Sequence, residues 1–135
     1  SRGEVVDTQA LSDALDKGLI ADAILDVWEG EPNIDTTLLY KVFVGTPHIA
    51  GYSAQGKANA SAIVIDAIAK EFGLPLRGWY PAKVTPTQRH AIGWDEMCQT
   101  IADYCDLSAE STLLRLSPEA FETLRNNYNY REEYF

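Results

Sequence analysis

Three side chains in the first half of the sequence could together bind an anion and move a proton: Arg2, Glu31 and His48. A guanidinium holds a carboxylate through two parallel hydrogen bonds. An imidazole takes up a hydroxyl proton, and a carboxylate behind the ring fixes its tautomer. These are the groups needed to oxidise a 2-hydroxy acid by hydride transfer. Each residue also has an interpretation without function: Arg2 as a solvated charge, Glu31 as a loop carboxylate and His48 as a turn residue.

Two predicted strands would position these groups. Residues 21–28 contain an Ala-Ile-Leu run that ends at Asp26, and residues 42–44 form a second apolar run before Gly-Thr-Pro-His. Parallel strands that both end in polar loops place those loops at one edge of an open α/β sheet, where ligands usually bind. The sequence therefore predicts a site at that edge, with Asp26, Glu31 and His48 as its candidates.

The segments around these strands predict further elements. Residues 4–6 are strand-like, and a helix capped by Asp7 or Thr8 follows, with apolar residues on one face and an end at Gly18. A longer helix is predicted over residues 52–72, because small and apolar residues repeat at helical spacing up to Gly73. The predicted fold class is α/β, with part of a doubly wound, Rossmann-type sheet.

The composition changes after Gly73. Three prolines in residues 74–86 predict an extended connector, and helices are predicted over residues 94–104 and after Ser117, with a short segment at 113–116 between them. We therefore divide the chain into residues 1–73 and 74–135. The second part has aromatic residues typical of a contact surface, although an ordinary small α+β domain is the alternative. These aromatics are Trp79, Tyr80, Tyr128, Tyr130, Tyr134 and Phe135.

Composition and charge exclude several classes of partner. Twenty acidic and eleven basic residues give a net charge of −9, which disfavours nucleic acid and anionic membranes. No apolar run approaches the roughly 20 residues that span a bilayer, so a cytoplasmic location is predicted. Cys98 and Cys105 lie roughly 10 Å apart on a helix, too far for a disulfide, and are predicted to be small core residues. No metal site is predicted, because His48 and His90 are scattered.

Three motifs occur in order along the chain. Segments 1–7, 25–32 and 46–51 read SRGEVVD, LDVWEGEP and TPHIAG. Together they resemble the motif set of the D-isomer-specific 2-hydroxyacid dehydrogenases. The resemblance implies that Arg2, Glu31 and His48 are catalytic, with Arg2 also binding substrate. It further implies an NAD site lined by Ser1, Arg2, Asp26 and Gly51, and substrate contact by Tyr52.

Segments 47–59 and 114–128 resemble one member of that family in particular. This resemblance implies oxidation of 4-phospho-D-erythronate (4-phosphoerythronate) by NAD to 2-oxo-3-hydroxy-4-phosphobutanoate, in pyridoxal 5'-phosphate (vitamin B6) biosynthesis. Two alternatives stay open. One is a non-catalytic oligomerisation or binding module that keeps the fold, and the other is a dehydrogenase for a different 2-hydroxy acid.

Two parts of such an enzyme have no counterpart in this sequence. The Gly-x-Gly-x-x-Gly loop, whose backbone amides hold the pyrophosphate of NAD, is absent, and so is the amino-terminal substrate domain. We therefore expect this chain to be the carboxy-terminal portion of a longer enzyme and to be inactive by itself. The resemblance also implies that residues 74–135 are a connector and a small α+β dimerisation domain, through which a homodimer forms.

Overall fold

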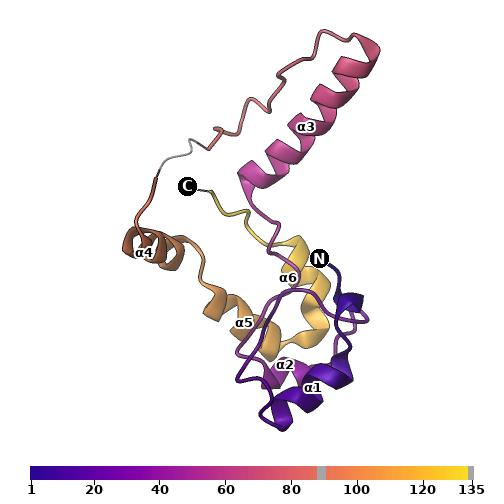
Figure 1. Cartoon of the computed structure of the whole chain (residues 1–135), viewed down its shortest axis with the longest axis vertical. Helices are drawn as coiled ribbons and strands as arrows, with labels where there is room; N and C mark the ends of the chain where they lie inside the picture. Colours follow the sequence, from indigo (N-terminus) through magenta and orange to yellow (C-terminus); the bar gives the residue numbers. More distant parts are fainter. Residues whose placement is uncertain (88–90, 134–135) are drawn as a thin grey trace. The chain divides into compact units, whose positions relative to one another are not determined.

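The computed structural model describes residues 1–87 and 91–133 (Figure 1). Contacts divide the chain into two compact units. The first comprises Ser1–Ala50 and Asp106–Tyr128, and the second Gly51–Cys105 and Asn129–Phe135. Along the chain the elements are η1 (Gly3–Val5), α1 (Thr8–Asp16), β1 (Ile24–Leu25), α2 (Thr36–Lys41), β2 (Val44–Gly45), α3 (Ala54–Phe72), α4 (Trp94–Tyr104), α5 (Leu107–Leu116), η2 (Pro118–Ala120) and α6 (Phe121–Asn126).

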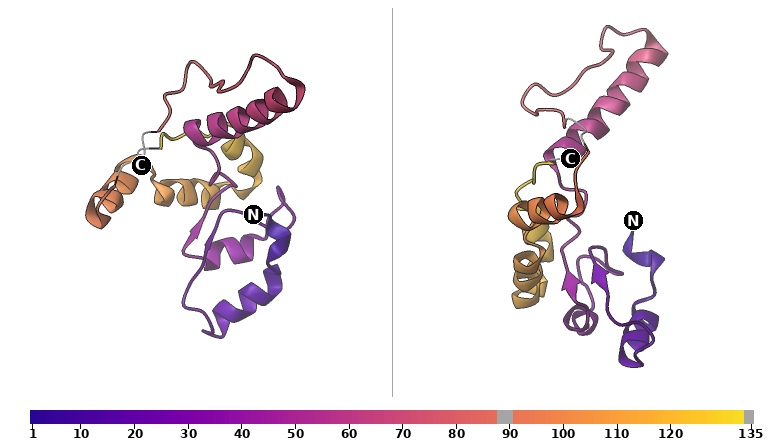
Figure 2. Two further views of the ribbon diagram at one scale, coloured as in Figure 1. Left: turned by 45° about the horizontal axis from the view of Figure 1, so that its top comes forward. Right: turned by 60° about the vertical axis from the view of Figure 1, so that its left-hand side comes forward.

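The first unit contains a two-stranded parallel sheet. Ile24 of β1 pairs with Val44 of β2, and Leu25 pairs with Gly45, so the two arrows lie side by side (Figure 2). The Thr46 N–H extends this ladder by donating to the Leu25 carbonyl at 2.9 Å. The prediction of two parallel strands whose following loops share one edge is confirmed, although each strand is very short.

Helices from both ends of the sequence complete the core of this unit. α5 packs on β2, and α1 and α2 pack on each other. Leu114 of α5 and Phe121 of α6 are at most 1% exposed and join a cluster whose other buried members are Trp28, Ile34, Leu38, Leu39 and Val42. Residues 106–128 thus belong with the sheet, so the contact units do not follow the division between residues 73 and 74. The prediction that residues 1–73 and 74–135 have separate functions stays a prediction.

Two local expectations for the first unit are corrected. Residues 4–6 are not a strand: Gly3–Val5 is a 3₁₀ helix closed by the Val6 N–H donating to the Gly3 carbonyl. The side chains of Val5 and Val6 are exposed, so no packing favours an extended conformation there. The helix α2 was not predicted, although Asp35 caps it by accepting the Leu38 N–H at 2.7 Å.

Some of the other helix ends follow from the sequence. Asp7, one of the two predicted candidates, caps α1 by accepting the Ala10 N–H at 2.8 Å. Ser53 caps α3 just after the predicted start, and Gly73 ends α3 in the left-handed conformation at φ 61°. Ser117 makes no side-chain cap, and a short 3₁₀ turn precedes α6 instead.

The connector after α3 turns back along that helix within the second unit. Asp66 of α3 accepts the Gly78 N–H at 3.1 Å and the Arg77 Nε–H at 2.8 Å. These hydrogen bonds hold the pKa of the Asp66 carboxyl below its usual range, and the bond from the Gly78 backbone has the largest effect. Residues 74–87 contain turns but no helix or strand, as the prolines predicted. Their role as a connector between two domains stays a prediction.

The predicted burial of the cysteines is wrong for Cys98, which is exposed, while Cys105 is half-buried. The reason is that α4, which carries Cys98, has no buried residue.

Among the predicted contact aromatics, Trp79 and Tyr130 are exposed and Tyr80 and Tyr128 are half-buried. Tyr134, Phe135 and His90 lie outside the described residues.

One further feature concerns membranes. Within the part of the chain that the structure describes, no helix is both long enough and apolar enough to cross a bilayer. The cytoplasmic location stays a prediction.

The packing around β2 gives a stability prediction. A Cβ on Gly45 would lie 2.7 Å from Leu39 Cδ1 and 2.8 Å from Trp28 Cζ2, and both of those side chains are buried. Gly45→Ala should therefore lower the free energy of unfolding by about 1–3 kcal/mol in urea titrations, because overpacking forces the core to shift. Gly51→Ala, whose Cβ would meet open space, should change it by less than about 0.5 kcal/mol. Equal stability of the two variants would contradict the packing described for β2.

Candidate active site

An imidazole and a carboxylate form a close pair in the first unit. His48 follows β2 and Glu31 follows β1, and His48 Nδ1 lies 2.7 Å from Glu31 Oε2. Each side chain is only 19% exposed. Because a carboxylate only accepts hydrogen bonds, the proton lies on Nδ1 in the neutral ring, and Nε2 is then the nitrogen that can accept a proton. The structure thus brings together two of the three predicted catalytic groups.

The loop that carries His48 is held by Asp26, at the carboxyl end of β1. One oxygen of this carboxylate accepts the Thr46 Oγ1–H and the Ile49 N–H, each at 2.7 Å, and the other accepts the Ala50 N–H at 3.0 Å. His48 itself has φ 59°, a left-handed conformation that is uncommon for a residue with a side chain. The bonds on both sides of His48 therefore stabilise a backbone shape that is unfavourable in isolation.

Trp28 positions the carboxylate of Glu31, which pairs with His48. Its backbone N–H donates to Glu31 Oε1 at 2.8 Å, so the two oxygens of Glu31 accept from two different loops. Its buried indole Nε1–H donates to the Thr46 carbonyl at 2.9 Å. Trp28 thereby links the loop after β1 to the loop after β2.

Arg2 lies on the same cavity as this pair. The cavity has a volume of about 210 Å³, and its lining includes Arg2, Glu31 and His48. The next residue, Gly3, is buried, and a Cβ there would overlap the Trp28 carbonyl. A side chain at position 3 would therefore push the segment that carries Arg2 away from the site.

The carboxy-terminal segment contributes cavity residues that the sequence did not reveal. Phe121, Glu122 and Arg125 of α6 line the same cavity as His48. They lie far from His48 along the chain, and the sequence predicted only a helix after Ser117. No local signal in the sequence indicated that Arg125 lies beside the catalytic candidates.

The predicted cofactor residues fall in both units. Ser1 is exposed and lines a smaller cavity of about 50 Å³ together with Arg2. Asp26 can accept a further hydrogen bond, because each carboxylate oxygen has two lone pairs. Gly51 and Tyr52 belong to the second unit. Asp26 therefore keeps an acceptor that suits the amide group of nicotinamide, and the binding of NAD by the predicted residues stays a prediction. No segment of this sequence corresponds to the loop that would cradle the pyrophosphate of NAD.

Metal ligands do not gather in the described part of the chain. Among residues 1–87 and 91–133, no three His, Cys, Asp or Glu side chains are grouped as a metal ion would require.

Comparison with known protein families gives a match within the first unit. Residues 1–50 match the family model described as "D-isomer specific 2-hydroxyacid dehydrogenase, NAD binding domain". Residues 1–50 are thus similar to the NAD-binding domain of this family. Its cofactor, NAD, is the one that the motifs predicted, and its match covers Arg2, Asp26, Glu31 and His48.

Curated relatives match the chain over nearly its whole length. The erythronate-4-phosphate dehydrogenase of Bacteroides thetaiotaomicron is 43% identical over 98% of this chain and 38% of its own length. Those of Baumannia cicadellinicola and Porphyromonas gingivalis are 39% and 36% identical over 98% of this chain, which covers 38% and 37% of their lengths. The chain thus spans less than half the length of the curated relatives it matches, and it is homologous to them.

The His48–Glu31 pair gives a prediction about the imidazole proton. Glutamine at position 31 has a single acceptor, its carbonyl oxygen. The Trp28 backbone N–H can only donate a hydrogen bond, so it requires that oxygen. The amide NH₂ of Glu31→Gln then faces Nδ1, so the neutral His48 ring should carry its proton on Nε2 instead. Long-range ¹H–¹⁵N correlation spectra of the imidazole report this change directly.

A matched control is available two residues earlier. Glu29 accepts the Thr8 N–H at 3.1 Å, and the carboxylate that contacts His48 is that of Glu31. Glu29→Gln should therefore leave the His48 tautomer as it is in the unchanged chain. A proton that stays on Nδ1 in Glu31→Gln would contradict the pairing.

Proposed function

We propose that this chain supplies the proton-transfer part of an NAD-dependent dehydrogenase that oxidises 4-phospho-D-erythronate to 2-oxo-3-hydroxy-4-phosphobutanoate. The observation that carries the proposal is the 2.7 Å contact between His48 and Glu31 on a cavity that Arg2 also lines. The names of the homologues, which are erythronate-4-phosphate dehydrogenases, support the choice of substrate. The reaction would serve pyridoxal 5'-phosphate synthesis.

Each of these cavity residues has a separate role in this reaction. The Arg2 guanidinium binds the substrate carboxylate and fixes the adjoining carbon, which bears the hydroxyl. His48 Nε2 takes the hydroxyl proton as a general base, and the Glu31 carboxylate stabilises the imidazolium that forms. NAD, when bound, supplies the acceptor for the hydride that leaves the same carbon. Ser1, Arg2, Asp26 and Gly51 would hold its nicotinamide end.

The larger architecture is proposed on the same basis. β1 and β2 would be two strands of a doubly wound, Rossmann-type sheet, whose carboxyl edge carries Asp26 and His48. Residues 74–135 would include a dimerisation region, because Leu76, Trp79 and Tyr130 expose large apolar surfaces. The whole enzyme would then be a homodimer.

The role of His48 is tested in the full-length protein that contains this chain. His48→Asn should lower kcat by about 10²–10⁴-fold, because an amide cannot accept the hydroxyl proton. Asparagine is chosen because it tolerates the left-handed backbone conformation at this position better than alanine does. The Kd for NAD should stay within about twofold of the unchanged protein, since the imidazole acts on the substrate. Turnover near that of the unchanged protein would contradict the proposed base.

The binding-module alternative is tested by the same assay. A module without catalytic function would show no NADH formation from 4-phosphoerythronate in the full-length protein. A dehydrogenase for another 2-hydroxy acid would have a higher kcat/KM for that acid than for 4-phosphoerythronate.

The phosphate group of the proposed substrate suggests a role for Arg125. A substrate with two anionic groups needs a second cation, and Arg125 lines the cavity that Arg2 also lines. Arg125→Ala should raise KM for 4-phosphoerythronate by about 10–100-fold, as expected for the loss of a charge-assisted hydrogen bond. The kcat/KM for unphosphorylated erythronate should stay unchanged. Arg77→Ala, which removes an exposed arginine paired with Asp66, is the matched control.

A further inference from the structure

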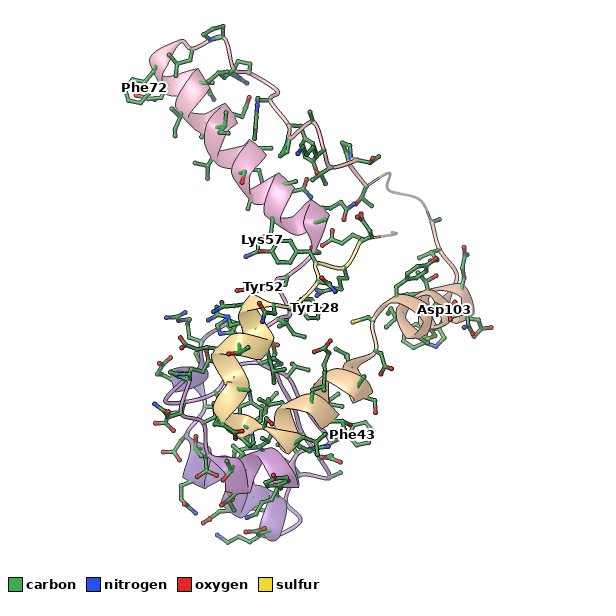
Figure 3. All side chains as sticks on the ribbon, turned by 180° about the vertical axis from the view of Figure 1, so that it is seen from behind. Phe43, Tyr52, Lys57, Phe72, Asp103 and Tyr128 are labelled. Atoms are coloured by element: carbon green, nitrogen blue, oxygen red, sulfur yellow. The ribbon has the colours of Figure 1, made fainter. Side chains whose placement is uncertain are left out.

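Helix α5 of the first unit binds the backbone of the segment that leads into β2. Arg115 Nη2 donates to the Val42 carbonyl at 2.6 Å and to the Phe43 carbonyl at 3.1 Å. The Arg115 Nε–H donates to the Leu39 carbonyl of α2 at 3.4 Å. Figure 3 shows Phe43 beside α5. One side chain of α5 thus holds the turn between α2 and β2.

A second side chain of the same helix binds β2 itself. The Ser111 hydroxyl oxygen accepts the Gly45 N–H at 3.1 Å. Ser111 is 2% exposed and Gly45 is buried, so this hydrogen bond is shielded from water. The N–H of the next residue, Thr46, donates to the Leu25 carbonyl of β1. Because a buried N–H is costly without an acceptor, β2 is held both by β1 and by a hydroxyl of α5.

Gly45 is connected to both members of the His48–Glu31 pair. His48 follows Gly45 by three residues in the chain. The Gly45 backbone lies so close to the Trp28 indole that a Cβ would be 2.8 Å from Cζ2. The Trp28 N–H in turn donates to the Glu31 carboxylate at 2.8 Å. A shift of β2 would therefore disturb the contact between the imidazole and the carboxylate.

We propose that Ser111 and Arg115 are positioning residues, which hold β2 so that the loop after it keeps His48 against Glu31. This inference rests on the proposed function, in which His48 is the general base. A base acts only within hydrogen-bond reach of the proton that it takes, so a small displacement of its loop lowers kcat. Helix α5 then serves the reaction through β2, without touching the substrate.

The attachment of β2 is tested first by hydrogen exchange in this chain. Ser111→Ala removes the acceptor of the Gly45 N–H, so this amide should exchange at least about tenfold faster. The His48 Nδ1–H should also exchange faster, because its carboxylate partner is less well placed. Ser111→Thr keeps the hydroxyl and should preserve both rates. Unchanged exchange at either proton in Ser111→Ala would overturn the inference.

The same helix offers a matched control. Ser108 is exposed on α5, so Ser108→Ala makes the same chemical change without removing an acceptor from β2. Its exchange rates at Gly45 and His48 should equal those of the unchanged chain. Acceleration as large as that in Ser111→Ala would show that the hydroxyl of Ser111 has no special role, and would overturn the inference.

Kinetics in the full-length protein then test the positioning role. Ser111→Ala should lower kcat for 4-phosphoerythronate by about 3–10-fold, as the loss of one hydrogen bond predicts, with the KM for NAD unchanged. Ser111→Thr should restore kcat. In a His48→Asn background, Ser111→Ala should have no further effect on kcat, because no base remains to be positioned. A helix that only stabilised the fold would lower kcat by the same factor in both backgrounds.

Arg115→Met tests the same inference without removing the acceptor of the buried Gly45 N–H. Methionine keeps an apolar stem but has no donor for the three carbonyls. This variant should also lower kcat, and the effect should again vanish in the His48→Asn background. Arg77→Ala, which removes an exposed arginine of the second unit, should leave kcat unchanged.

The failures of the two proposals are distinguishable. An active unchanged enzyme whose Ser111→Ala and Arg115→Met variants keep the original kcat would overturn this inference alone. An unchanged enzyme that does not oxidise 4-phosphoerythronate would overturn the proposed function. The exchange rate of the His48 Nδ1–H in this chain would then still decide whether α5 holds the His48–Glu31 contact.

Discussion

The candidate site depends on one carboxylate, that of Asp26, which accepts hydrogen bonds from three donors in the loop after β2. That loop must place His48 at φ 59°, a conformation that costs free energy for a residue with a Cβ. The donors lie before and after His48, so the carboxylate fixes both ends of the strained residue. Once the backbone is fixed, the imidazole lies within hydrogen-bond distance of Glu31, whose other oxygen is held by the Trp28 N–H. Asp26 thus acts structurally at the position where the motif resemblance places a cofactor contact.

Segments distant in sequence complete both units. In the first unit, Leu114 and Phe121 close the core beside the sheet, and α6 then presents Arg125 to the cavity that Arg2 and His48 line. In the second unit, residues 129–133 cover the start of α3 and pack Tyr130 on Tyr52. The carboxy-terminal region therefore contributes to the surroundings of the candidate residues, in addition to the contact surface proposed for it.

Part of this arrangement was predictable because it is local. The cap at Asp7, the glycine that ends α3 and the acid at the end of β1 depend on neighbouring residues, and the structure has them where the sequence predicts. The approach of Glu31 to His48 followed from two parallel strands with a shared edge. The contributions of Arg125 and Tyr130 could not be predicted, because they arise from packing between segments far apart in the chain, without any sequence periodicity. The burial predicted for Cys98 was wrong for a related reason, since helical spacing shows that residues share a face but not what covers it.

The most direct test of the central claim is hydrogen exchange in the Asp26→Asn variant of this chain. An asparagine has one acceptor oxygen and cannot serve donors at both carboxylate positions. The account predicts that the Ile49 and Ala50 N–H groups and the His48 Nδ1–H exchange much faster than in the unchanged chain, while the buried indole N–H of Trp28 stays protected. Unchanged exchange at Ile49, Ala50 and His48 Nδ1 would contradict the claim that Asp26 holds the loop that carries His48.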